Sequence, residues 1–116
     1  MRLQILKSKI HRATVTEACL DYEGSISIDK YLMKKSGIVS YEKVHILNIT
    51  NGNRVETYVI KAPAGSKSVC INGAASHLIR PNDTVIILSY CVVEEAAVES
   101  HAPLFVKVNN KNEIID

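Results

Sequence analysis

Two short segments of this 116-residue chain combine residue types that could do chemistry. They are Tyr22-Glu23-Gly24-Ser25, just before an expected strand, and Asn72-Gly73-Ala74-Ala75, where a helix is expected to begin. A serine hydroxyl can act as a nucleophile, and backbone N–H groups near a helix start are natural hydrogen-bond donors. Both segments also have an ordinary structural interpretation, as a turn and as a helix N-cap followed by small packing residues.

Familiar catalytic motifs are absent. The chain has no Gly-x-Ser-x-Gly motif, no phosphate-binding glycine loop and no His-Glu-x-x-His motif. The four histidines, at positions 11, 45, 77 and 101, share no metal-ligand spacing. The sequence therefore predicts no metal site.

Composition and charge exclude several classes of protein. The formal net charge is +2 without a basic run, so neither nucleic acid nor an anionic membrane is expected as a partner. Three cysteines without paired close spacing indicate reduced thiols rather than a disulfide framework. No signal peptide is expected at the N-terminus, and the longest apolar stretch, 85–93, is too short to span a membrane. We therefore expect a soluble, cytoplasmic protein with one domain over residues 1–116.

The elements that must position these segments are mainly strands. Valine and isoleucine number 26 against 8 leucines, and β-branched residues favour strands. Alternation and turn residues predict strands at 3–6, 12–18, 25–28, 43–49, 54–60, 69–71, 84–93 and 104–108. Helices are expected at 30–36, between an Asp29 cap and Gly37, and at 74–78. A hairpin turn is expected at Asn51-Gly52, because both residues accept a positive φ. We expect strand 84–93 to be buried on both faces, and residues after 94 to form a peripheral helix or tail. This pattern predicts a mainly β fold, a closed or nearly closed small barrel with short helices.

Five motifs, in order and at matching spacing, identify a resemblance. The motifs are Lys9-Ile10-His11-Arg12-Ala13, Tyr22-Glu23-Gly24-Ser25-Ile26, Thr50-Asn51-Gly52-Asn53-Arg54 with Thr57-Tyr58-Val59-Ile60, Ile71-Asn72-Gly73-Ala74-Ala75 and Asp83-Thr84-Val85-Ile86-Ile87. Over roughly residues 3–93 the chain resembles the pyruvoyl-dependent aspartate 1-decarboxylases, which make β-alanine for pantothenate and coenzyme A synthesis. The resemblance implies a small double-psi β-barrel that assembles as a homotetramer, with active sites between neighbouring subunits.

The resemblance also implies that the chain cuts itself between Gly24 and Ser25. The Ser25 hydroxyl would attack the Gly24 carbonyl to form an ester, and elimination with loss of ammonia would leave a pyruvoyl group in place of Ser25. The products would be a β chain of residues 1–24 and an α chain of residues 25–116. The pyruvoyl group would be the covalent cofactor, the electron sink that decarboxylation requires.

By the same resemblance, further residues take roles in processing. Thr57 would donate a hydrogen bond to the oxyanion formed at Gly24. His11, Tyr22 and Asn72 would orient groups and move protons around the cleavage site. At position 24, a residue without Cβ is expected to tolerate an unusual backbone and to leave its carbonyl open to attack.

Other residues would act on the substrate, L-aspartate. Lys9 and Arg54 would bind its carboxylates, and we assign the side-chain carboxylate to Arg54 because clamping the departing carboxylate would oppose catalysis. Tyr58 would be the proton donor. Thr57 and the backbone of Gly73, Ala74 and Ala75 would complete the binding site.

Two alternatives remain open at the level of sequence. The chain could be a non-catalytic, ligand-binding barrel in which Gly24-Ser25 is only a turn. It could instead keep the pyruvoyl chemistry but act on another amino acid such as glutamate, because one methylene changes specificity by only about 1–3 kcal/mol. A helper protein for maturation is compatible with the sequence but not indicated by it.

Overall fold

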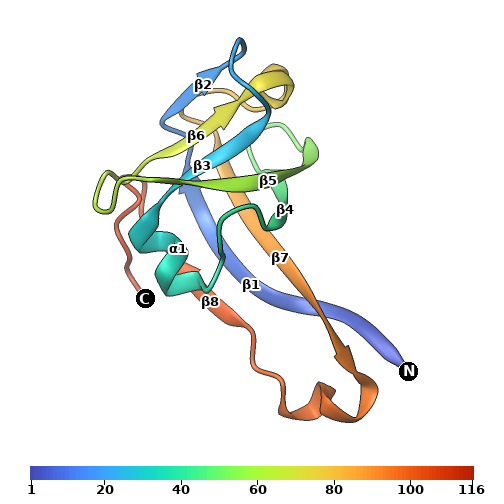
Figure 1. The fold of residues 1–116 in the computed structure, drawn as a ribbon. Helices are drawn as coiled ribbons and strands as arrows, with labels where there is room; N and C mark the ends of the chain where they lie inside the picture. The colour runs from blue at the N-terminus through green and yellow to red at the C-terminus, as the bar shows by residue number, and fades with distance from the viewer.

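A computed structural model describes residues 1–116 and contains one eight-stranded sheet with strand order β2-β6-β3-β5-β4-β7-β1-β8. The strands are β1 (Arg2–Thr14), β2 (Glu17–Cys19), β3 (Ser25–Asp29), β4 (Lys43–Asn48), β5 (Arg54–Ala62), β6 (Val69–Asn72), β7 (Thr84–Glu94) and β8 (Leu104–Lys107). The helices are α1 (Lys30–Ser36) and the two 3-10 helices η1 (Gly73–His77) and η2 (Glu95–Ser100). The sheet curls on itself (Figure 1), so the predicted mainly β, small-barrel fold is confirmed.

Inward-facing aliphatic side chains fill the barrel. Strand β4 alternates, with Val44 and Ile46 buried and His45 and Leu47 only partly buried. The same alternation in the other strands builds a core of 18 buried residues that is rich in valine and isoleucine. The outer face of each strand is thus left free to carry functional side chains.

The helix predicted at 30–36 is confirmed together with both of its caps. The Asp29 carboxylate accepts a 2.8 Å hydrogen bond from the Tyr31 N–H, and Gly37 adopts the left-handed conformation that ends the helix. The hairpin predicted at Asn51-Gly52 connects β4 to β5, and Gly52 has a positive φ of 82°.

Two expectations about the longest strands were wrong. Residues 3–6 and 12–18 do not form separate strands, because β1 runs unbroken from Arg2 to Thr14 and bends at a bulge between Ile10 and Ala13. Strand β7 is not buried on both faces. Its burial alternates from Val85 to Ser89, because the inner residues meet the core while the outer ones face away from the barrel.

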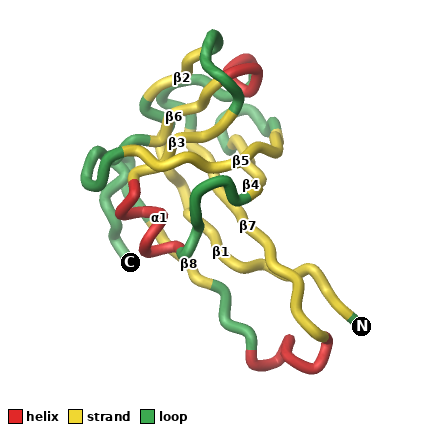
Figure 2. Tube along the Cα trace, viewed as in Figure 1, coloured by secondary structure: helices red, strands yellow, loops and turns green.

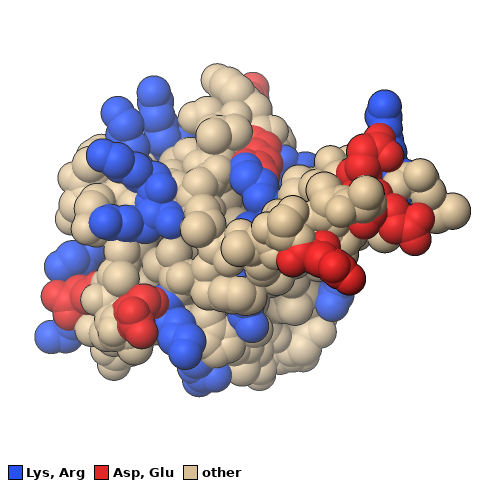
Figure 3. Space-filling view, turned by 90° about the horizontal axis from the view of Figure 1, so that it is seen from below, with Lys and Arg blue, Asp and Glu red and all other residues tan.

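The ends of β1 and β7 extend beyond the barrel as a two-stranded arm that ends in η2 (Figures 1 and 2). The arm gives the chain its elongated outline of 43 × 28 × 24 Å. Figure 3 shows acidic side chains toward the projecting end and a group of basic side chains over the barrel. The acidic residues where β7 meets η2, at the end of the arm, are Glu94, Glu95 and Glu99.

Of the peripheral helix or tail expected after residue 94, the structure has the helix, as η2, and the segment after it is fixed against the barrel. Strand β8 pairs in parallel with β1, and the buried side chain of Asn112 exchanges hydrogen bonds with the backbone N–H and C=O of Thr14. Asn112 also donates to the Lys67 carbonyl, so it joins β1, the loop before β6 and the C-terminus. The strand predicted at 104–108 is therefore confirmed, with its observed end at Lys107.

Candidate active site

The junction between Gly24 and Ser25 lies where an exposed turn enters the barrel. Gly24 is exposed, whereas Ser25 begins β3 and is 2% exposed. Strand β3 lies between β6 and β5, so its first residue has neighbours on both sides. The bond between these two residues thus joins an exposed glycine to a serine that is held in the sheet.

Asn72 is the side chain that holds Ser25. Ser25 and Asn72 are opposite each other in the antiparallel β3–β6 pair. The Asn72 amide donates hydrogen bonds of 2.9 Å to the Ser25 Oγ and 3.0 Å to the Ser27 Oγ. These bonds fix the position of the Ser25 hydroxyl oxygen.

Ser27 and Cys70 belong to the same network and were missed by the sequence analysis. The Cys70 thiol donates to the side-chain amide oxygen of Asn72, Oδ1, at 3.3 Å. Desolvation by burial, then Glu17 and Cys19, raise the pKa of this thiol, so it stays protonated as a donor. The i, i+2 spacing of Ser25 and Ser27 could have suggested Ser27. Cys70 could not be recognised, because its contact depends on the β3–β6 register.

The structural demand for glycine falls on Gly73 rather than on Gly24. Gly24 does not have a positive φ, and a Cβ placed on it would meet no atom within 4 Å, so neither feature requires glycine at this position. Gly73 has a φ of 75°, and its Cβ would lie 2.8 Å from the Gly24 Cα and 3.0 Å from the Tyr22 carbonyl oxygen. Gly73 therefore allows the turn before Ser25 to pack closely against η1.

Tyr58 is next to Ser25 on the other side of β3. The parallel register pairs Ile26 with Val59, so Ser25 and Tyr58 are the preceding positions of neighbouring strands. Both residues alternate with buried core positions and thus share the outer face. Thr57 precedes Tyr58 and therefore faces the other side of β5, where it is the cross-strand partner of buried Val44.

The remaining predicted residues near the junction lie in the turn and in η1. Tyr22 is exposed in the turn, and Ala74 and Ala75 follow Gly73 in η1.

His11 lies on β1 at the bulge, beside Arg12, which has a positive φ of 66°. Its Nδ1 atom is buried without a hydrogen-bond partner. Desolvation by burial, followed by repulsion from Lys9, Arg12 and Lys107, lowers the pKa of His11. The imidazole is therefore neutral at pH 7 and can accept a proton.

Lys9 and Arg54 are not brought to Ser25 within one chain. Lys9 pairs with Leu88 on β1, and Arg54 pairs with Leu47 at the start of β5. Three strand spacings separate β5 from β1, or about 14 Å along the sheet. Arg54 is also four residues before Tyr58 along β5, which is about 13 Å in an extended strand.

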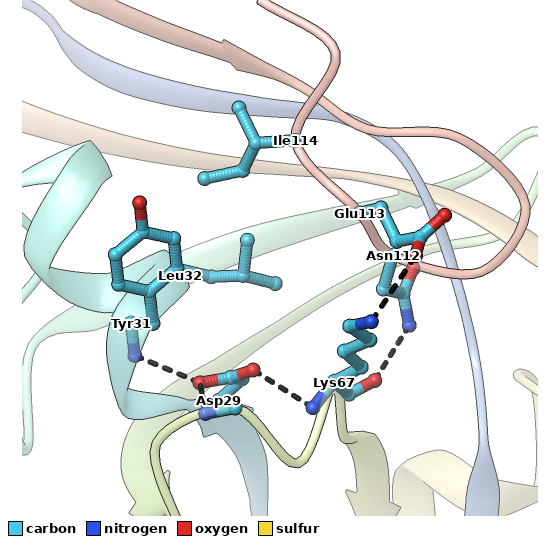
Figure 4. Close-up of a pocket in the computed structure, with 8 residues that line it drawn as sticks. Asp29, Tyr31, Leu32, Lys67, Asn112, Glu113 and Ile114 are labelled. Carbon is cyan, nitrogen blue, oxygen red and sulfur yellow. Dashed lines mark hydrogen bonds and ion pairs between the residues drawn. The ribbon is translucent and has the colours of Figure 1, made fainter.

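The well-formed cavities of the chain are elsewhere. One, of about 280 Å³, lies between α1, the loop before β6 and the C-terminal segment (Figure 4). At its edge the Asp29 carboxylate accepts hydrogen bonds from three backbone N–H groups, and Lys67 pairs with Glu113 at 3.2 Å. These polar groups already have hydrogen-bond or ion-pair partners within the chain, and their contacts hold the C-terminal segment against the loop before β6. None of the three cavities is lined by Gly24, Ser25, Tyr58 or Asn72.

Comparison with known proteins adds independent evidence. The family model described as aspartate decarboxylase matches residues 1–115. An aspartate 1-decarboxylase of Dehalococcoides mccartyi is 53% identical over 110 residues, covering 95% of this chain and 89% of the relative. Those of Clostridium kluyveri and Caldicellulosiruptor saccharolyticus are 50% and 51% identical, covering 98% and 99% of this chain and 90% of each relative. The chain belongs to the aspartate decarboxylase family.

As a member of the aspartate decarboxylase family, the chain is an enzyme, so the alternative of a non-catalytic barrel is wrong. The match also extends past Val93 into the C-terminal segment that Asn112 anchors. No helix of the structure is long and apolar enough to cross a membrane. The predicted site residues therefore form two groups in this chain. Tyr58, Asn72 and Gly73 lie around Gly24 and Ser25, whereas Lys9, His11 and Arg54 lie on other parts of the sheet.

Proposed function

We propose that this enzyme converts L-aspartate to β-alanine and CO2, using a pyruvoyl group that it makes from its own Ser25. The observation that carries the proposal is the hydrogen bond from Asn72 to the buried Ser25 hydroxyl, directly after the exposed residue Gly24. The names of the relatives support aspartate as the substrate. The β-alanine would serve pantothenate, and hence coenzyme A, synthesis in the cytoplasm, where the three free cysteines would remain reduced.

Self-cleavage begins with attack of the Ser25 Oγ on the Gly24 carbonyl carbon. The new C–O bond replaces the Gly24–Ser25 amide bond, and the hydroxyl proton moves to the released amine. Elimination then transfers the Ser25 Cα proton to a base and breaks the bond between the Ser25 Cβ and Oγ, so that Gly24 leaves as a carboxylate. The dehydroalanine left at position 25 reacts with water, releases ammonia and becomes the pyruvoyl group. Holding the nucleophile beside its target supplies much of the rate of such an intramolecular reaction.

The residues around the junction fit these steps. Asn72 orients the Ser25 hydroxyl. Neutral His11 could accept a proton if it were brought near the Gly24–Ser25 junction. Thr57 is proposed to donate to the oxyanion at Gly24, which requires it to turn from the side of β5 that it faces in this structure. Tyr22, in the exposed turn, is proposed to orient groups and move protons at the junction. A pyruvoyl group would fit the position of Ser25, because Asn72 could donate to its oxygen as it does to the Ser25 hydroxyl.

In the processed enzyme the pyruvoyl group supplies the electron sink for decarboxylation. Tyr58, on the neighbouring strand, is proposed to return a proton to the substrate carbon. Arg54 would bind the carboxylate that the substrate keeps, and Lys9 is proposed as a second carboxylate-binding residue. The backbone N–H groups of Gly73, Ala74 and Ala75 would donate to the bound substrate.

We further propose that the active site is completed by a second copy in a homotetramer. The positions of Lys9 and Arg54 support this, because their strands lie about 14 Å apart along the sheet and neither residue lies beside Ser25 within one chain. The outer face between these strands carries the apolar side chains of Leu47, Ile86 and Leu88, which a neighbouring subunit would cover.

Intact mass spectrometry of the purified, denatured protein, before and after prolonged warming, tests the proposal. We expect two chains, residues 1–24 and residues 25–116, the larger with a pyruvoyl mass and no free amine. The Ser25→Ala variant should remain intact. A wild-type chain that stays whole, even after incubation in a lysate of the source organism to supply any helper protein, would overturn self-processing. Turnover of glutamate in preference to aspartate would overturn the substrate assignment.

A further inference from the structure

We infer that Gly73 is a positioning residue for self-cleavage: its missing side chain lets the backbone of Gly24 lie against η1 and sets the scissile bond for attack. This inference rests on the proposed self-processing at Gly24–Ser25. It assigns Gly73 a role before any substrate is present, distinct from donating a backbone hydrogen bond to aspartate.

The contact is between backbone atoms. A Cβ on Gly73 would lie 2.8 Å from the Gly24 Cα, 2.9 Å from the Gly24 N and 3.0 Å from the Tyr22 carbonyl oxygen. Real Cβ atoms essentially never approach other atoms below 3.0 Å. Backbone atoms cannot rotate away as a flexible side chain can, so any side chain at position 73 would displace the turn.

Gly73 and Asn72 act on the two sides of the scissile bond. Asn72 fixes the Ser25 Oγ through its amide, and Gly73 leaves the space that the Cα and N of Gly24 occupy, directly before the carbonyl under attack. Two consecutive residues at the junction of β6 and η1 thus set two consecutive residues at the start of β3. An intramolecular attack depends steeply on such placement, and a displacement of about 1 Å can cost on the order of 100-fold in rate.

The turn before Ser25 makes few packing contacts that would hold it in place. Residues 19–24 are exposed, and Gly24 meets no side chain at the position of its own missing Cβ. Displacing this turn therefore need not unfold the barrel, whose core lies on the other face of β3 and β6. A side chain at position 73 should slow cleavage while leaving the fold intact.

Three variants distinguish the steric clash of an added side chain from the backbone strain of a positive φ. Gly73→Ala adds both a clash and the strain of a positive φ. Gly73→Asn keeps the clash but relieves part of the strain, because asparagine tolerates the left-handed region. Gly65→Ala is the matched control, since Gly65 has a similar φ of 82° but open space where its Cβ would lie.

The experiment follows cleavage by intact mass, with thermal unfolding as the measure of folding. We expect Gly73→Ala and Gly73→Asn to fold and to cleave at least about 100-fold more slowly than the wild type, and Gly65→Ala to cleave within about threefold of it. Hydroxylamine, which cuts esters, provides a second readout. It should release residues 1–24 as a Gly24 hydroxamate from the wild type, and at least about tenfold less from both Gly73 variants.

Wild-type cleavage rates in the Gly73 variants would overturn the inference while leaving the proposed function intact. Gly73 variants that do not fold would also overturn it, because the effect is expected to be confined to the exposed turn. Equal slowing in Gly65→Ala would attribute the loss to backbone strain and overturn it as well. A wild-type chain that never forms the ester would instead overturn the proposed function, and this inference with it.

Discussion

Asn72 and Ser25 are 47 residues apart in the chain, and the Asn72 amide donates a 2.9 Å hydrogen bond to the Ser25 hydroxyl oxygen. The same amide donates to Ser27 and accepts from the Cys70 thiol. With all three contacts made, the amide has one orientation, so Asn72 presents an N–H group rather than its oxygen to the nucleophile.

Asn72→Ala should slow self-cleavage about tenfold, because the loss of one oriented hydrogen bond to a buried group costs about 1–1.5 kcal/mol. Cleavage is followed by intact mass at fixed temperature. The control is Asn110→Ala, which changes an exposed residue of the C-terminal turn. Unchanged cleavage in Asn72→Ala would mean that Ser25 does not need this contact.

Tyr58→Phe should retain self-cleavage and lose turnover by a factor of about 100 or more, which is typical of removing a general acid. Tyr41→Phe is the control, because its ring lies 6.4 Å from that of Tyr58 but its side chain is largely exposed. Release of β-alanine by the fully processed protein is the measurement. Normal turnover in Tyr58→Phe would exclude the proton-donor role.

Arg54→Lys should raise the KM for aspartate about tenfold or more with a smaller change in kcat. Lysine keeps the charge but loses the paired N–H groups that bind a carboxylate. Arg2→Lys, on the exposed end of β1, provides the control. Near-normal kinetics in Arg54→Lys would assign the carboxylate to another group.

The pKa of His11 gives the stability of the protein a dependence on pH. Folding lowers the pKa of His11 from the ordinary histidine value of about 6.5. Below that pH, position 11 therefore binds more protons in the unfolded chain than in the folded chain. The favourable contribution is therefore complete above that pH and is lost as the pH falls through the folded pKa. Urea unfolding between pH 8 and pH 5 should show a smaller acid loss for His11→Gln than for the wild type or for His77→Gln. Parallel curves for the three proteins would contradict it.

Asn112→Ala should lower the free energy of unfolding by about 2 kcal/mol or more, because it leaves buried backbone groups at Thr14 without partners. Thermal unfolding of the Ser25→Ala background, which cannot be processed, measures this without interference from cleavage. Asn110→Ala in the same background is the control. A change as small as that of the control would mean that the C-terminus is not anchored by Asn112.

Local sequence signals predicted the parts of the fold that depend on neighbouring residues. The Asp29 cap, the Gly37 stop and the hairpin at Gly52 were correct because each reflects a conformational preference or a short hydrogen bond. The continuous strand β1 and the one-sided burial of β7 were not predicted. A bulge and the orientation of a strand face depend on which strand lies alongside.

For the site, the sequence by itself determined the residue types: a serine after a glycine, an asparagine before a glycine, and the order of motifs shared with the aspartate decarboxylases. Only the tertiary structure decided which of them meet. The β3–β6 register brings Asn72, Cys70 and Ser27 to Ser25, and places Gly73 rather than Gly24 where a side chain cannot fit. Contacts across 47 residues depend on strand order and register, which the packing of the whole core selects and no local pattern specifies.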